Sequence, residues 1–177
     1  AVFTHCFRNV PLLVQVFLWY FVVPELLPED WGMAIKGMNP TWNQFLTLLV
    51  ALSLYTAAKA AEHVRAGIQA VPAGQMAAAR ALGLDLAGSY RYVILPQAMR
   101  IVLPPLTSDF LNVFKNSAVA LTIGLLELTG RSRQMSEFSA QPFEAFLAAT
   151  VLYMGITWCV FLFRRGGGPK PRLPLHL

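Results

Sequence analysis

Four long, mostly apolar stretches separated by polar segments dominate the pattern of this chain. The first stretch, Val10 to Leu27, carries Gln15 as its one polar residue before Glu25. At 1.5 Å per residue its length comes close to crossing a bilayer core of about 30 Å. We therefore predict a membrane-spanning helix over this range.

Two other apolar stretches predict spanning helices in the same way. Phe45 to Ala61 is apolar with small residues and hydroxyls, the composition by which membrane helices approach one another closely. Phe143 to Phe163 makes the last span. The segment 28–42 is polar and rich in Gly and Pro, which predicts a loop in water. The segment 129–142 is polar again.

The stretch 101–128 is too long for one straight crossing. Pro104 and Pro105 predict that a helix breaks or starts there, and the polar pair Asn116 and Ser117 predicts a second break. The pattern leaves open whether residues 118–128 complete the crossing or re-enter the membrane.

Composition agrees with a bilayer protein. Hydrophobic residues make up 56 % of the 177 positions and charged residues 13 %, about half the charged share of a typical soluble protein. The formal net charge is +5. The basic residues flank apolar runs and form no motif known to bind nucleic acid, so we expect no nucleic-acid partner. Cys6 and Cys159 are far apart, and the three His residues show no ligand spacing, so we expect neither a metal nor a cofactor.

The basic residues also predict an orientation, because Lys and Arg are retained on the cytoplasmic side. Alternating the spans places Arg8, the region 67–100 and the tail 164–177 inside. The basic residues left outside are Lys36, Arg131 and Arg133. The region 67–100 therefore belongs to the cytoplasm in this interpretation.

The most specific motif lies in that cytoplasmic region. Gln75 to Gly83, nine further residues and then Val93 to Pro96 resemble the EAA loop of ABC importer permeases, whose pattern is Glu-Ala-Ala, three residues, Gly, nine residues and Ile-x-Leu-Pro. Ala77 stands where the family usually has Glu, which removes a charge that often contacts the partner. In such permeases this loop forms a short coupling helix that sits in a groove of the ATPase subunit. The resemblance assigns coupling to Ala77, Ala78, Ala79, Arg80, Leu82, Gly83, Leu95 and Pro96.

The residues themselves fit that role. Ala78 and Ala79 permit close docking, Gly83 can supply the left-handed turn that ends a helix, and Pro96 resets the chain before the next span. The alternative for the motif alone is a surface helix with a glycine cap.

Further segments resemble the polar amino acid permease family, most of all its glutamate/aspartate type. These segments are Arg8 to Gln15, Leu54 to Ala58, Val64 to Ile68, Leu103 to Thr107 and Lys115 to Ser117. The resemblance runs from about Arg8 to Phe163. Family members have a further spanning helix before the segment that begins at Arg8, so we expect that this first family helix is missing here.

Pattern and resemblance together predict an all-α integral membrane protein. It has about four spanning helices in an ABC importer permease fold, with a permease domain over 1–163, a coupling loop over about 67–100 and a flexible, basic, Pro/Gly-rich tail over 164–177. The resemblance implies a multi-pass protein of the bacterial inner membrane. It also implies a dimer of ATP-binding subunits, a second permease subunit that is identical or different, a periplasmic solute-binding protein and membrane lipid as partners.

Polar groups within the third stretch are candidates for a substrate path, since ionisable groups at membrane depth are costly. Asp109, Asn112 and Asn116 recur at i, i+3 and i+7 and line one helix face, and Lys115 could compensate a substrate carboxylate. The alternative is that these groups hydrogen-bond neighbouring helices. Lys59 lies near a predicted helix end and could extend its amine to the headgroups.

No phosphate-binding loop, nucleophile elbow or paired catalytic carboxylates occur in the sequence. We therefore expect a transport subunit without enzymatic activity, which forms the path for amino acids, with glutamate and aspartate expected, while a partner hydrolyses ATP. The alternatives are an ion-coupled secondary transporter or channel using Asp109 and Lys115, an integral-membrane enzyme, and an inactive truncated permease.

Overall fold

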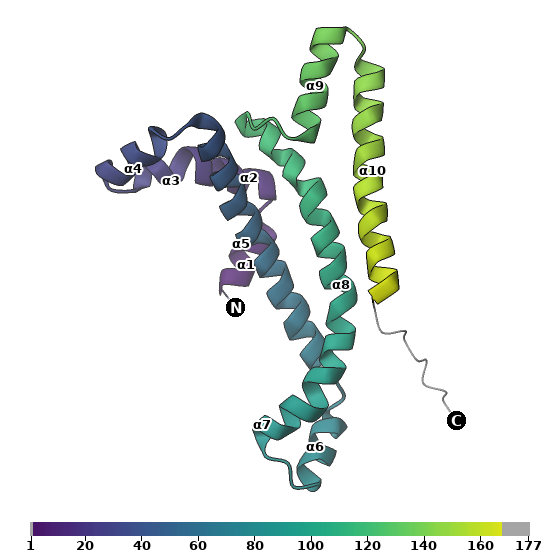
Figure 1. Ribbon diagram of the computed structural model, residues 1–177. Helices are drawn as coiled ribbons and strands as arrows, with labels where there is room; N and C mark the ends of the chain where they lie inside the picture. Colours follow the sequence, from purple (N-terminus) through teal and green to yellow (C-terminus); the bar gives the residue numbers. More distant parts are fainter. Residues whose placement is uncertain (1, 168–177) are drawn as a thin grey trace. The chain divides into compact units, whose positions relative to one another are not determined.

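The computed structural model describes residues 2–167, and the secondary structure of this part of the chain is entirely helical (Figure 1). Two compact units divide the chain, Ala1–Gly130 and Arg131–Leu177. The predicted tail lies outside the described residues from position 168 onward. The boundary at 163 between a permease domain and a tail stays a prediction.

The first predicted span is helical but sharply bent from the helix before it. Helix α1 (Val2–Asn9) and the helical run Leu12–Leu26 meet at 104°. The bend is held by Gln15, whose buried amide donates to Phe7 O at 2.7 Å and Val10 O at 2.9 Å. A polar residue within an apolar run thus satisfies backbone carbonyls that the bend leaves without helical partners.

The run Leu12–Leu26 is itself composed of three parts. These are α2 (Leu12–Phe17), a π-helical turn (Leu18–Val22) and α3 (Val23–Leu26). The π turn comes just before Pro24, whose ring would crowd the carbonyl four residues earlier in a regular α-helix. The wider turn lets the helix continue through the proline.

Residues 28–42 were predicted to be a loop, and this is wrong for most of the segment. Helix α4 (Glu29–Lys36) fills it, with the breakers Pro28 and Gly37 at its two ends. Acidic residues occupy its first turn and Lys36 its last, which suits the helix dipole. Lys36 also pairs with Glu25 at 2.6 Å. The helix-breaking residues Pro28 and Gly37 were recognised correctly, but they mark the two ends of a short helix.

The longest helix, α5 (Pro40–Gln69), extends the predicted second span at both ends. Asn39 caps it by accepting the Thr41 N–H at 3.0 Å. Its 30 residues measure about 45 Å, more than a bilayer core needs. Figure 1 shows α5 running beside α8 (Leu95–Asn116) for much of its length.

Helix α8 contradicts one prediction and supports another. Pro104 and Pro105 lie inside a continuous helix, so the predicted break at this pair is wrong. Membrane helices tolerate internal prolines because small local adjustments accommodate them. The predicted break at Asn116 and Ser117 is confirmed, since α8 ends at Asn116 and a 3₁₀ segment, Ser117–Ile123, follows.

A small apolar core joins α2 to α5 and to the 3₁₀ segment. Seven buried side chains from α2, α5 and the 3₁₀ segment make up this core: Leu12, Val16, Leu48, Ala51, Leu52, Ala120 and Ile123. Most other large apolar side chains of these helices remain exposed. Such exposure is expected where lipid replaces a protein interior.

The last two helices are α9 (Leu128–Ser139) and α10 (Pro142–Gly167). Most of the polar segment 129–142 is the helix α9. Ala140, with φ of 55°, makes the turn between the two helices.

The segments that can cross a membrane agree with the predicted fold class. Within the described residues, α5 and Pro142–Leu162 of α10 are long and apolar enough to span, and two bent helix pairs raise the number of possible spans to four.

Candidate functional site

The EAA-like segment folds as helix α6 (Ala73–Ala81), which begins directly after Pro72. At its end, Leu84 N donates to Ala79 O at 3.2 Å and Gly83 N donates to Arg80 O at 3.0 Å. Gly83 has φ of +84°. This is the Schellman arrangement, in which a left-handed residue ends a helix. The prediction that Gly83 terminates the helix in a left-handed turn is confirmed.

Helix α6 has one side packed on this chain and one side exposed. Ala79 is buried, and Met76 packs on a cluster formed by Val71, Ile94 and Ala98. The other side presents Ala77, Ala78, Arg80, Ala81 and Leu82, and we call these five residues the α6 outer face. Leu82 is 84 % exposed. A mostly small and apolar face of this kind suits close docking of another protein surface.

The two sequence candidates at the end of the motif lie elsewhere. Leu95 and Pro96 form the first turn of α8, and both are exposed. The side chain that anchors the motif is Ile94, which is 4 % exposed. Sequence reasoning missed Ile94, Val71 and Met76, although their apolar character beside the EAA-like helix was a usable signal.

Between α6 and α8 lie a short helix, α7 (Leu86–Ser89), and a π-helical turn, Tyr90–Ile94. Asp85 caps α7 by accepting the Gly88 N–H at 2.8 Å. The π turn again comes just before a proline, Pro96, as it does before Pro24. The chain therefore enters α8 without an irregular loop.

The packing ties α6 to the ends of both long helices. Val71 follows α5, Ile94 precedes α8 and Ala98 lies in its first turns, with Ile68, Met76 and Val93 packed around them. Gln97 Nε2 also donates to Gln75 Oε1 at 3.3 Å. Figure 1 shows α6 and α7 together at one end of the α5–α8 pair. Helix α6 is therefore packed against the ends of two long helices at once.

A charged cluster lies farther along the same helix pair. The Asp109 carboxylate of α8 is 7 % exposed, and its Oδ1 accepts a hydrogen bond of 2.5 Å from Lys59 Nζ of α5. His63 Nε2, one turn from Lys59, lies 2.8 Å from Asp109 Oδ2. The Lys59 amine also lies 5.8 Å from the centre of the Tyr55 ring. Sequence reasoning missed this pairing and placed the Lys59 amine among headgroups.

The structure separates the four path candidates. Asp109 is turned towards α5, as the alternative of helix-to-helix bonding predicts. Asn112 and Asn116 are half-buried, whereas Lys115 is exposed. Lys115 follows Asp109 by six residues, and at about 100° per residue this points it about 120° away from the carboxylate. Asp109 and Lys115 therefore do not form one site within this chain.

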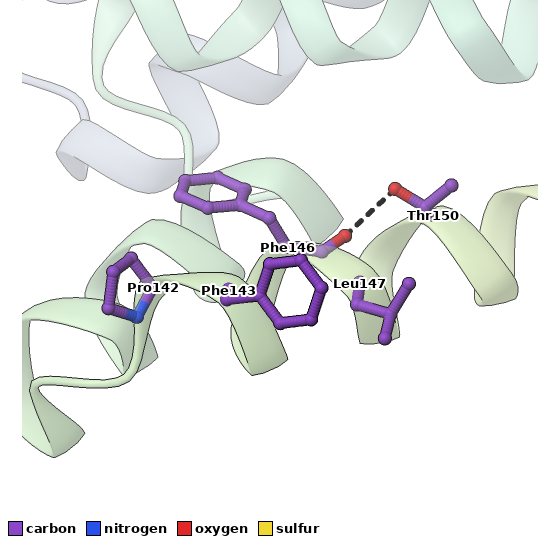
Figure 2. A pocket seen from close by; sticks show the side chains of 5 residues that line it. All are labelled: Pro142, Phe143, Phe146, Leu147 and Thr150. Atoms are coloured by element: carbon purple, nitrogen blue, oxygen red, sulfur yellow. Dashed lines mark hydrogen bonds between the residues drawn. The ribbon is translucent and has the colours of Figure 1, made fainter.

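A shallow hollow at the start of α10 carries no comparable chemistry. Figure 2 shows its lining, Pro142, Phe143, Phe146, Leu147 and Thr150, with the Thr150 hydroxyl donating to Phe146 O of its own helix at 2.8 Å. Because the lining has no charged group, the hollow resembles a lipid-facing surface.

Comparison with known proteins decides the family. The model of the binding-protein-dependent transport system inner membrane component family matches residues 1–172. The chain belongs to this family. Among its relatives, the glutamate/aspartate import permease protein GltJ of Escherichia coli (strain K12) is 45 % identical over 175 residues, which cover 98 % of this chain and 71 % of that protein.

Other proteins similar to this chain have names that do not mention glutamate or aspartate. The general L-amino acid transport system permease protein AapQ of Rhizobium johnstonii is 42 % identical over 88 % of this chain and 38 % of its own length. A crystal structure of an amino acid ABC transporter with histidines matches with a TM-score of 0.75 and 35 % identity, covering 93 % of this chain and 73 % of that chain. The resemblance to amino acid ABC permeases and the all-α membrane fold are thereby confirmed.

Proposed function

We propose that this chain is a membrane-spanning subunit of an ATP-driven amino acid importer. The match of the family model to residues 1–172 carries the proposal, and the likeness to a solved amino acid ABC transporter supports it. Its sequence holds no phosphate-binding loop, which supports ATP hydrolysis by a partner subunit. Its role is to form part of the path across the bacterial inner membrane.

Coupling to the ATPase is assigned to the α6 outer face. This face is exposed, while the opposite side of α6 is packed on the ends of α5 and α8. An ATPase that grips the outer face would move both membrane helices. Ala77 leaves no charge at the position where the family usually has Glu, so shape carries more of the contact at this position.

The partners follow from the family. They are two ATP-binding subunits, a second permease subunit and a solute-binding protein on the outer side. The second permease subunit would complete a path bordered by the exposed Lys115 and the half-buried Asn112 and Asn116. Asp109 supports that path from behind, through its contacts with α5.

Acidic amino acids are the proposed cargo. The 45 % identity to a glutamate/aspartate import permease over 98 % of the chain supports this choice. A cationic amine such as that of Lys115 near the path would favour a substrate with a second carboxylate.

The test is association with an ATPase. The chain is expressed with the ATPase, the second permease subunit and the solute-binding protein of an amino acid importer, and the affinity-tagged chain is purified in mild detergent. We expect the ATPase to co-purify and to hydrolyse ATP faster when the loaded binding protein is added. A chain that folds, transports and retains no ATPase would contradict the proposal and favour a secondary transporter.

A further inference from the structure

The cluster of Lys59, His63 and Asp109 is unusual for its place in the molecule. Lys59 lies ten residues before the end of α5, about 15 Å along the helix axis. Ionisable groups within a membrane helix are costly and tend to serve transport. Here one carboxylate faces two side chains that can carry positive charge.

The cluster is open on one side. The Asp109 side chain is 7 % exposed, but those of Lys59 and His63 are 27 % and 33 % exposed. An ammonium group has three donors, and the one hydrogen bond that Lys59 Nζ forms among the described residues goes to Asp109 Oδ1. Two donors therefore remain on an amine whose position is fixed by Asp109 and by the Tyr55 ring.

The packing of α5 on α8 does not require an ion pair at this position. Helices α5 and α8 already approach closely at Gly67 and Val102, and the cluster at Val71 and Ile94 joins their ends. A buried ion pair that serves stability alone can often be replaced by apolar residues without loss. An ion pair whose amine is partly exposed is better explained by binding of a ligand to that amine.

We propose that Lys59 is a specificity-determining residue that receives a carboxylate of the transported amino acid. This inference rests on the proposed function and deepens it. Asp109 holds the amine in place, and the free N–H groups of Lys59 donate to the incoming carboxylate. Without the amine, the Asp109 carboxylate would repel an acidic substrate.

The recognition step is binding alone, and no bond to substrate forms or breaks. Asp109 keeps the empty site near neutrality, so the cost of a bare cation at membrane depth is avoided. A substrate carboxylate then gains charge-assisted hydrogen bonds from a donor that is already positioned. A cationic amino acid gains nothing from the amine and is disfavoured.

The experiment uses the complete importer in proteoliposomes. ATP is supplied on the side of the vesicle membrane where the ATPase lies. The measured quantity is L-glutamate imported per ATP hydrolysed, with co-purification of all subunits as the check on assembly. The central variant carries Lys59→Gln and Asp109→Asn together, which keeps a polar contact between the helices and leaves no unpaired charge. Lys59→Arg preserves the cation, and Lys36→Gln, in α4, is the matched lysine control.

We expect the double variant to assemble and hydrolyse ATP while glutamate imported per ATP falls roughly tenfold or more, the effect of losing charge-assisted hydrogen bonds. Lys59→Arg should retain most of the import, and Lys36→Gln should match the wild type. Wild-type import per ATP in the double variant would overturn the inference and leave the importer function intact. A wild-type importer that assembles and carries no acidic amino acid would instead overturn the proposed cargo.

A second variant covers the case in which the double variant does not assemble. Lys59→Asp together with Asp109→Lys keeps the ion pair but moves the amine to the buried side. We expect assembly with loss of glutamate import, because the open position now carries a carboxylate. Retained import would show that only the pairing of the helices matters, and would overturn the inference.

Discussion

Gly67 of α5 and Val102 of α8 fix how closely the two long helices approach. A Cβ on residue 67 would overlap Val102 Cγ2 and come within 3.3 Å of Ala98 O, so no larger residue fits without moving a helix. Along α5 and α8, both positions lie between the residues that pack on α6 and the charged cluster. The helix pair is therefore tightly packed on the route by which motion of α6 would reach the path.

Enlarging Gly67 should destabilise this pair. We expect Gly67→Ala to lower the free energy of unfolding by about 1–3 kcal/mol, the usual cost of overpacking. The measurement is thermal unfolding of the purified protein in detergent. Adding Val102→Ala should recover part of the loss, because the overlapping methyl group is removed. Gly155→Ala in α10, which meets no atom within 4 Å, is the control and should not destabilise.

Gly83 is constrained by its backbone conformation alone. With φ of +84° and no atom within 4 Å of an added Cβ, Gly83→Ala should cost about 1 kcal/mol. The cost should appear at the end of α6, measured as faster amide hydrogen exchange at residues 79–84. Gly83→Asn should cost less, since Asn tolerates the left-handed region better. Equal exchange in all three proteins would contradict the assigned helix end.

Leu82 tests the α6 outer face. Its side chain is 84 % exposed, so Leu82→Asp should change folding stability by no more than about 0.5 kcal/mol. It should nevertheless reduce retention of the ATPase during purification, because a charge replaces an exposed apolar side chain of the proposed docking surface. Leu86→Asp, on α7, is the matched control and should have the smaller effect. Equal losses from both changes would show that the contact is not specific to α6.

Lys115 tests the path. The side chain is exposed on α8 and directed away from Asp109, so Lys115→Met should leave assembly unchanged. We expect uptake of acidic amino acids by the complete importer to fall several-fold, because a cation beside the path is lost. Initial rates of labelled glutamate uptake provide the measurement. Unchanged uptake would remove Lys115 from the path while leaving the coupling loop unaffected.

Most of the membrane-spanning helices and the end of α6 could be predicted from sequence, because they depend on the length of apolar runs and on short motifs. Gly83 illustrates the point: its place after an Ala-rich helix predicted the left-handed turn that the structure contains. The break at Asn116 was predicted for the same reason, from polar residues within an apolar stretch.

Other features could not be predicted, because they depend on contacts between distant segments. Lys59 and Asp109 are 50 residues apart, and only the packing of α5 on α8 shows that they pair. The prolines of α8 failed as predictors because local adjustment within a membrane helix accommodates them without a break. The polar composition of 28–42 was likewise mistaken for a loop, since most of this segment is the helix α4.

The most direct measurement of the central claim is uptake of labelled glutamate by proteoliposomes that contain this chain with its permease, ATPase and binding-protein partners. The account predicts that uptake requires ATP on the side of the α6 outer face and stops when Leu82→Asp removes the ATPase contact. Uptake that persists without ATP, or that follows an imposed ion gradient, would contradict it.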